Sequence, residues 1–288
     1  MKSKTKYPIT PKQLQAVFDA ANLGEIIHSK PMTDGWYNTV VCVTTEMGKF
    51  VIKVATHPNV RVLRHERNIL AQELRYIALL KEHGVNVPVV RFHDLSKVVI
   101  PCDYFVMEHL PGQRLDKAGG DAEQQKNAVL AAFHAIKGNG FGYEQLGFES
   151  NWYLALKKMV QALIDDCADF GKKCKRGEKL LALIEQHREI LEPVPCVFVN
   201  FDLHNKNLFW HEGELTVLDL ERCFWGDRMG DYVYGSQPKD ITPEEKIRRD
   251  LMSCYLAVVA YTEKYSRYRP WNATWWEDVA MQKYFWRG

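Results

Sequence analysis

Residues 199–231 of this 288-residue chain read V-N-F-D-L-H-N-K-N-L-F-W-H-E-G-E-L-T-V-L-D-L-E-R-C-F-W-G-D-R-M-G-D. Apolar runs rich in β-branched and aromatic residues predict three short strands, and a Glu-Gly turn between the last two is typical of a hairpin. These runs are residues 194–199, 207–210 and 214–220. Three polar side chains, Asp202, Asn207 and Asp219, stand at the strand ends, and the hairpin is expected to fold the last one back beside the other two.

This arrangement indicates phosphoryl transfer. One carboxylate can take a hydroxyl proton, while an amide and a second carboxylate hold Mg²⁺. The spacing D-L-x-x-x-N followed by a strand-end aspartate is also that of the kinase catalytic loop and its metal-binding aspartate. We therefore predict Asp202 as the catalytic base, with Asn207 and Asp219 as metal ligands. A hairpin with ordinary polar loop residues is the alternative.

A family resemblance rests on these same motifs. Residues 202–207, D-L-H-N-K-N, resemble the D-L-H-x-x-N core of the aminoglycoside phosphotransferase family, which consists of small-molecule kinases with a protein-kinase-like fold. Residues 218–221, L-D-L-E, resemble the second motif of that family. The family usually reads H-G-D where this chain has Asn200 and Phe201 before Asp202, so a bulky ring replaces a glycine.

The resemblance implies an α+β, protein-kinase-like bilobal fold. A β-rich N-terminal lobe with one main helix is expected to bind the nucleotide and to span residues 1–110. A larger, mostly helical lobe with the catalytic and acceptor sites is expected over residues 111–288. In that lobe Asp231 matches an aspartate that usually braces the catalytic loop, and His134 matches a common histidine that we interpret as structural.

Lys53 is a charged residue within the apolar run F-V-I-K-V, and it resembles the V-A-I-K lysine that reaches the α and β phosphates. A buried lysine needs a partner. A helix predicted over residues 61–82 offers Glu73, which matches the ion-pairing glutamate of the family and is preferred, and Glu66, which lies two turns earlier on the same face. For either residue alone, the alternative is a lysine at a strand edge or a solvated glutamate.

Two further segments are expected to touch the nucleotide. Gly35, in T-D-G-W-Y-N, lies where a kinase fold places its nucleotide-covering loop, although a surface turn is the alternative. The apolar run at residues 104–110 leads into Pro-Gly and resembles the hinge between the lobes. Glu108 and His109 are therefore expected to offer main-chain carbonyl and amide groups to adenine, and an edge strand followed by a turn is the alternative.

Local patterns predict the remaining scaffold. A first helix begins with Thr10 as N-cap and Pro11 at its first position, and a late one begins at a capping box formed by Thr242 and Glu245. Other expected elements are a hairpin at residues 37–45 and 49–55 and helices at 122–137, 152–170, 178–191 and 243–265. Aromatic residues near the C-terminus are interpreted as helix packing, with a wall for an acceptor ring as the alternative: Trp271, Trp275, Trp276, Tyr284, Phe285 and Trp286.

The composition narrows the classes of partner. A hydrophobic content of 46% suffices for a substantial core, and a net charge of +2 with interleaved signs predicts neither a nucleic-acid nor a membrane partner. Seven scattered cysteines without a C-x-x-C pair predict neither a disulfide framework nor a zinc site. The N-terminus lacks an apolar signal region, and no run approaches the ~20 apolar residues of a membrane helix. We therefore expect a cytoplasmic protein, as a monomer or homodimer.

The functional prediction is an ATP- and Mg²⁺-dependent O-phosphotransferase, with GTP as the alternative nucleotide. The resemblance favours a cationic acceptor, an aminoglycoside-like antibiotic, and therefore a role in resistance. A metabolic kinase acting on a sugar, a choline-like molecule or an amino alcohol is an alternative within the same class. A nucleotide-binding pseudokinase with little or no transfer activity is an alternative from a different class.

Overall fold

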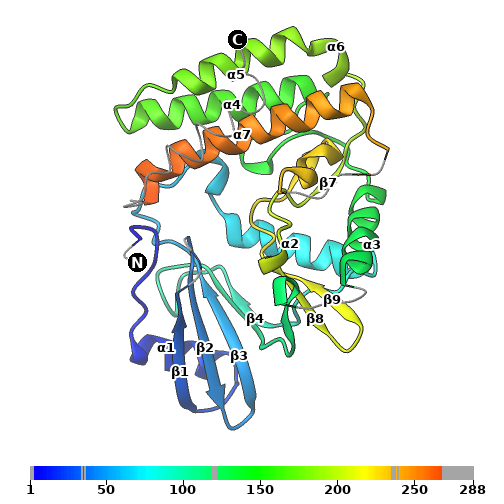
Figure 1. Cartoon of the computed structure of the whole chain (residues 1–288). Coiled ribbons are helices and arrows are strands. Elements are labelled where there is room, and N and C mark those ends of the chain that lie inside the picture. Colours follow the sequence, from blue (N-terminus) through cyan, green and yellow to red (C-terminus); the bar gives the residue numbers. More distant parts are fainter. Residues whose placement is uncertain are drawn as a thin grey trace.

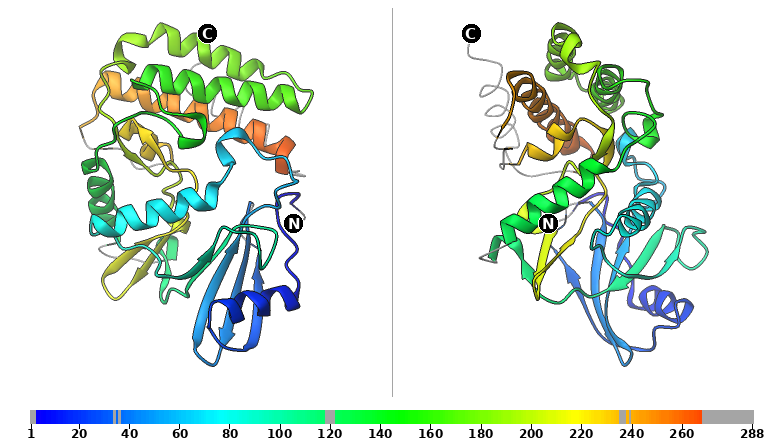
Figure 2. Two further views of the ribbon diagram at one scale, coloured as in Figure 1. Left: turned by 180° about the vertical axis from the view of Figure 1, so that it is seen from behind. Right: turned by 90° about the vertical axis from the view of Figure 1, so that its right-hand side faces the viewer.

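The structure is a computed structural model, and it describes residues 3–33, 35, 37–117, 122–234, 238 and 240–267. A twisted sheet with helix α1 (Pro11–Ala20) against it lies at one end of the molecule, and a layer of long helices lies at the other (Figure 1). Helix α2 (Ile69–Glu82) lies between these two parts, as the views in Figure 2 also show.

The sheet has five strands, all paired antiparallel in the order β1-β2-β3-β5-β4. The strands are β1 (Ile26–Met32), β2 (Thr39–Thr45), β3 (Gly48–Val54), β4 (Val90–Asp94) and β5 (Tyr104–Glu108). The predicted hairpin is β2 and β3, whose register pairs Thr45 with Gly48 and Val40 with Lys53. Strand β4, which the sequence patterns did not reveal, forms one edge. One face of the sheet packs on α1. Thr10 makes the expected capping box at the start of this helix.

The helix predicted over residues 61–82 is shorter than expected. Residues Arg64–Glu66 form a 3₁₀ turn, Asn68 has a positive φ of 53°, and α2 begins only at Ile69. In this segment a side chain replaces a main-chain carbonyl as acceptor, because the Glu66 carboxylate accepts from the Leu63 N–H at 2.9 Å. Because local side-chain acceptors compete with helix formation, the segment before α2 stays irregular.

The C-terminal part combines small sheets with a helical layer. Strands β6 (Gln113–Arg114), β8 (Leu208–His211) and β9 (Glu214–Val217) form one sheet, and β7 (Val197–Val199) pairs with β10 (Phe224–Gly226). The helices are α3 (Ala122–Ala135), α4 (Trp152–Asp169), α5 (Lys175–Gln186), α6 (Arg188–Leu191) and α7 (Pro243–Arg267). The predicted β8–β9 hairpin is thus present.

Two details of this part differ from expectation or extend it. The helix predicted over residues 178–191 is divided into α5 and α6 at His187, whose φ of −109° departs from helical geometry. Helix α7 begins as predicted, because the Glu245 N–H donates to the Thr242 hydroxyl at 3.2 Å and the Thr242 N–H donates to the Glu245 carboxylate at 3.1 Å. The core of this part lies mainly between α4, α5 and α7.

Several sequence interpretations concern other features of the chain. All seven cysteines are free thiols, and five of them are buried. Within the described residues, no helix combines the length and apolar composition needed to cross a membrane. The aromatic residues between Trp271 and Trp286 lie outside the described residues. The lobe boundary near residue 110 stays a prediction.

Candidate active site

The loop that follows β7 is fixed by a single buried carboxylate. Asp231 accepts hydrogen bonds from the main-chain N–H groups of Asn200 and Phe201, both at 2.9 Å. The Asn200 side-chain oxygen then accepts from the Asp202 N–H at 3.0 Å. The other Asp231 oxygen lies 3.0 Å from Nε2 of His134. These contacts agree with the structural roles expected for Asp231 and His134, and they present Asp202 from a defined backbone.

Phe201 stands where the family motif has glycine, and the backbone shows why glycine is usual. Its φ of 61° lies in the left-handed region, which a bulky residue adopts only at a cost. Burial of the ring offsets that cost, since it packs at 5.4 Å from the Phe224 ring and 5.6 Å from the Tyr255 ring. A Cβ on Gly230 would lie 2.9 Å from Val199 and 3.5 Å from the Phe201 ring, so this glycine leaves room for the packing.

Asp202 lies among polar partners at the end of this loop. The Asn207 amide donates to the Asp202 main-chain carbonyl at 3.1 Å and lies 3.5 Å from its carboxylate. Nε2 of His204 is 3.9 Å from the same carboxylate. Burial raises the pKa of Asp202, whereas the nearby positive charge of Arg222 opposes that rise. A carboxylate with a raised pKa in a polar cleft is suited to accept a proton.

Lys53 is buried and surrounded by three carboxylates. Its Nζ lies 2.8 Å from Glu73, 3.0 Å from Asp219 and 2.5 Å from Glu221. Burial alone would lower the pKa of Lys53, but the attraction of Asp219, Glu221 and Glu73 raises it well above the usual value. The lysine therefore stays charged, and it links β3 to α2 and to the segment after β9.

Glu66, the rival partner for Lys53, is excluded by its position. It precedes α2 instead of sharing a face with Glu73, and its buried carboxylate pairs with Arg267 at the end of α7. The single-helix prediction had placed both glutamates on one face. The turn at Asn68 removes that equivalence, so Glu73 alone reaches Lys53.

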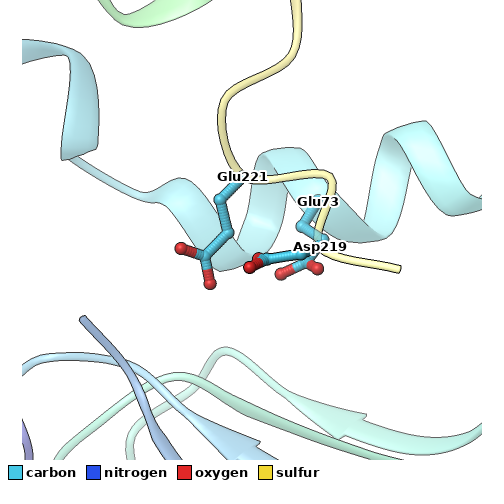
Figure 3. Close-up of side chains that lie close together, drawn as sticks. All are labelled: Glu73, Asp219 and Glu221. Atoms are coloured by element: carbon cyan, nitrogen blue, oxygen red, sulfur yellow. The ribbon is translucent and has the colours of Figure 1, made fainter. Parts of the chain in front are cut away.

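The three carboxylates around Lys53 also form a candidate cation site. Oxygen atoms of Glu73, Asp219 and Glu221 all lie within 4.8 Å of one another, and their side chains converge below α2 (Figure 3). Burial and the neighbouring Asp219 and Glu73 raise the pKa of Glu221 to about 8, although Lys53 opposes this rise. Carboxylate oxygens are the ligands that Mg²⁺ prefers, so the donor set fits a hard divalent cation. The Asp219 side chain is 40% exposed, which leaves this cluster accessible from the cleft.

The two predicted metal ligands flank a pair of neighbouring strands, because Asn207 directly precedes β8 and Asp219 follows β9. The Asn207 carbonyl accepts from the Leu218 N–H at 2.8 Å, directly before Asp219. The Asn207 side chain, however, is bonded to Asp202, and the third member of the carboxylate cluster is Glu221. Sequence reasoning noted Glu221 only as part of a motif. Its position two residues after Asp219 was the available signal, and the metal roles of Asn207 and Asp219 stay predictions.

The predicted adenine contacts lie at the end of β5. The Glu108 N–H donates to the Val89 carbonyl at 3.0 Å, and the His109 N–H donates to the Lys49 carbonyl at 3.1 Å. Both amides are thus engaged in this structure, and the amide part of the predicted adenine contact would require an exchange of these bonds. Gly35 is exposed, with open space around it. The nucleotide roles of these three residues stay predictions.

The chain matches the model of the phosphotransferase enzyme family over residues 28–271. No curated protein matches it significantly. It resembles the structure of a Haemophilus somnus 129PT protein assigned as a fructosamine-3-kinase, with 16% identity, 94% of this chain and 96% of that chain covered, and a TM-score of 0.68. A Ralstonia eutropha JMP134 protein assigned as an aminoglycoside phosphotransferase gives 16% identity, coverage of 94% of each chain and a TM-score of 0.64. The aminoglycoside phosphotransferase APH(4)-Ia, solved with ADP and hygromycin B, gives 12% identity, coverage of 92% of this chain and 95% of that chain, and a TM-score of 0.59.

We expect Asp231→Ala to lower the free energy of unfolding by about 2–4 kcal/mol, because two buried N–H groups lose their acceptor. Urea denaturation monitored by tryptophan fluorescence measures this change. The matched control is Asp231→Asn, which keeps one acceptor oxygen and should lose less. An alanine variant as stable as the wild type would show that other contacts hold the loop.

Proposed function

Because the chain belongs to the phosphotransferase enzyme family and is a small-molecule kinase, we propose that it transfers the γ-phosphate of ATP to a hydroxyl group of an amine-bearing small molecule, with Mg²⁺ as cofactor. Family membership confirms the resemblance inferred from residues 202–207 and 218–221. The likeness to solved relatives along nearly the whole chain confirms the α+β, protein-kinase-like fold.

One observation carries the proposal: a buried, charged lysine is held by a helix glutamate and an aspartate beside the presumed base. Lys53 and Glu73 form the ion pair that fixes a phosphate-binding lysine in kinases. Asp219, which also pairs with Lys53, directly follows Leu218, whose N–H donates to the Asn207 carbonyl. The Asn207 side-chain amide in turn donates to the Asp202 main-chain carbonyl. The candidate base and the candidate phosphate anchor are therefore joined through two neighbouring strands.

In the proposed mechanism these side chains supply positioning and charge. Lys53 binds phosphate oxygens and is itself fixed by Glu73. Asp202 accepts a hydrogen bond from the acceptor hydroxyl and orients its oxygen toward the γ-phosphorus. It takes up the hydroxyl proton as the new P–O bond forms and the bond from the γ-phosphorus to the bridging oxygen breaks, which releases ADP. Asp219, with Asn207 and Glu221 as neighbouring oxygen donors, would hold Mg²⁺, which neutralises charge on the phosphate oxygens. Positioning and electrostatic stabilisation account for most of the rate in such reactions.

The choice of nucleotide is supported by solved relatives. APH(4)-Ia has been solved with ADP, and a streptomycin complex of APH(2")-IIa contains ATP. We propose ATP for this chain and retain GTP as an alternative. Direct competition between the two nucleotides in a binding assay decides between them.

Two classes of acceptor remain in the proposal. An aminoglycoside-like antibiotic is the first, because solved relatives bind hygromycin B and streptomycin. An amine-bearing metabolite such as an amino sugar or amino alcohol is the second. It is favoured by Arg222, whose positive charge acts on the Asp202 carboxylate and disfavours a polycation at that point.

We expect Asp202→Asn to lower turnover by about 10²-fold or more while the nucleotide affinity changes little, because the proton acceptor is lost but the phosphate anchors remain. Steady-state kinetics and nucleotide titration measure the two quantities. Asp202→Glu, which keeps the carboxylate, serves as the matched variant. Turnover near the wild-type value would remove Asp202 from the catalytic role.

We expect Asp219→Ala to weaken Mg²⁺-dependent ATP binding by about tenfold or more, since a hard dication loses a charged ligand. ATP binding without Mg²⁺ is the internal control, and it should change less. Metal-dependent binding that survives unaltered would place the metal elsewhere in the cleft.

A coupled ATP-consumption screen identifies the acceptor class. Aminoglycosides, hygromycin-like compounds, cationic peptide antibiotics, macrolides, sugars and amino alcohols are tested, with mass spectrometry for a phosphate adduct. An aminoglycoside adduct would support the resistance role, and its binding should weaken as salt screens charges beyond ~8 Å. An adduct of a metabolite alone would replace that role with the metabolic one. ATP binding with no adduct would favour the pseudokinase alternative.

A further inference from the structure

Asn38 contacts the segment that follows β9. It lies directly before β2, at the end of the segment that contains Gly35, and its side chain is buried with 4% of the residue exposed. Its amide nitrogen donates to Oε1 of Glu221, which lies beyond β9. Lys53 donates to this same oxygen. Asn38 therefore connects the segment before β2 directly to the carboxylate cluster.

The hairpin register places Asn38 near Lys53. Val40 is the cross-strand partner of Lys53, so their side chains share one face of the sheet. Asn38 lies two residues before Val40, in the bend directly before β2. Asn38 and Lys53 both contact Oε1 of Glu221.

The other end of the Asn38 side chain is its carbonyl oxygen, Oδ1. Among the residues that the structure describes, no donor reaches Oδ1 of Asn38, although this oxygen is buried. The amide cannot simply be turned over, because Lys53 already donates to the Glu221 oxygen that the Asn38 nitrogen contacts, which makes that oxygen an acceptor. A buried carbonyl without a donor is costly, and such groups are rare unless a ligand or water completes them.

The surroundings indicate what kind of group supplies the missing donor. Three carboxylates share the single positive charge of Lys53, so the cluster is rich in acceptors. A divalent cation would balance the excess negative charge. Mg²⁺ dehydrates reluctantly and keeps several waters, and the polarised O–H groups of those waters are strong donors. A hydrated cation beside Glu221 would therefore satisfy both the carboxylates and the Asn38 carbonyl.

We propose that Asn38 is a positioning residue of the nucleotide–cation site: its N–H group holds Glu221 in the carboxylate cluster, and its free carbonyl oxygen accepts a hydrogen bond from the hydration shell of the bound cation. This inference rests on the proposed function, which places a divalent cation in that cluster. It adds Asn38, which directly precedes β2, to the residues that contribute to the cation site.

The test measures how much Mn²⁺, used as the probe cation, strengthens ADP binding. Calorimetric titrations with and without Mn²⁺ give this enhancement, and electron paramagnetic resonance of Mn²⁺ reports the bound cation independently of turnover. We expect Asn38→Leu to reduce the enhancement by about tenfold, the effect of one hydrogen bond to a charged group, while ADP binding without cation changes little. Asn38→Asp keeps an acceptor oxygen but loses the N–H donor to Glu221, so it should lose less of the enhancement than Asn38→Leu.

Asn86→Leu is the matched control, because Asn86 also donates to a glutamate, Glu214, at 3.1 Å but on the surface. It should leave the enhancement unchanged. Thermal unfolding identifies a variant that does not fold, in which case Asn38→Asp and Asn38→Ser carry the comparison. A structural role alone would lower the unfolding temperature and weaken ADP binding equally with and without Mn²⁺.

The outcomes separate this inference from the function on which it rests. If the wild type shows no cation-dependent ADP binding, the proposed function fails and the inference fails with it. If the wild type shows it and Asn38→Leu keeps the full enhancement, only the role of Asn38 is overturned. Equal losses in Asn38→Leu and Asn38→Asp would reject the carbonyl contact with the hydration shell.

Discussion

The burial of one charged amine governs the arrangement of the cleft. Lys53 lies in the buried part of β3, among apolar neighbours, and a buried ammonium group is tolerated only if opposite charges compensate for lost hydration. Glu73 on α2, together with Asp219 and Glu221 after β9, provides that compensation. Because these partners come from separate parts of the chain, satisfying the lysine also fixes the sheet against α2 and against the segment that bears the candidate metal ligands.

The loop that presents Asp202 shows how a family motif can change while its backbone geometry is kept. A positive φ at position 201 normally favours glycine, yet Phe201 occupies it here. The buried carboxylate of Asp231 accepts hydrogen bonds from the main-chain N–H groups of Asn200 and Phe201, and aromatic packing stabilises the Phe201 ring. The departure from the motif therefore leaves the backbone around Asp202 in a defined geometry. This retained geometry weakens the pseudokinase alternative that the sequence had raised.

A chain of ion pairs extends from the neighbourhood of Asp202 to the segment before α2. Arg222, whose charge acts on Asp202, pairs with Glu263 on α7, and Glu263 also lies 3.1 Å from Arg267. Arg267 in turn pairs with Glu66. Buried pairs of this kind are weak evidence for stability, but each fixes the direction of a side chain. The end of α7 is thus tied both to the surroundings of the base and to the segment that leads into α2.

Sequence alone determined the local elements and the order of the motifs. Periodicity and capping patterns located α1, α7 and the β2–β3 and β8–β9 hairpins, because those signals arise from neighbouring residues. Motif spacing selected Asp202, Asn207, Asp219 and Lys53. The sequence preferred Glu73 but left Glu66 open, and only the tertiary structure excluded Glu66, because a turn at Asn68 breaks the helical spacing that had placed both on one face. It alone also revealed the contact of Asn38 with Glu221, since 183 positions separate these residues and no local pattern encodes a contact formed by long-range packing.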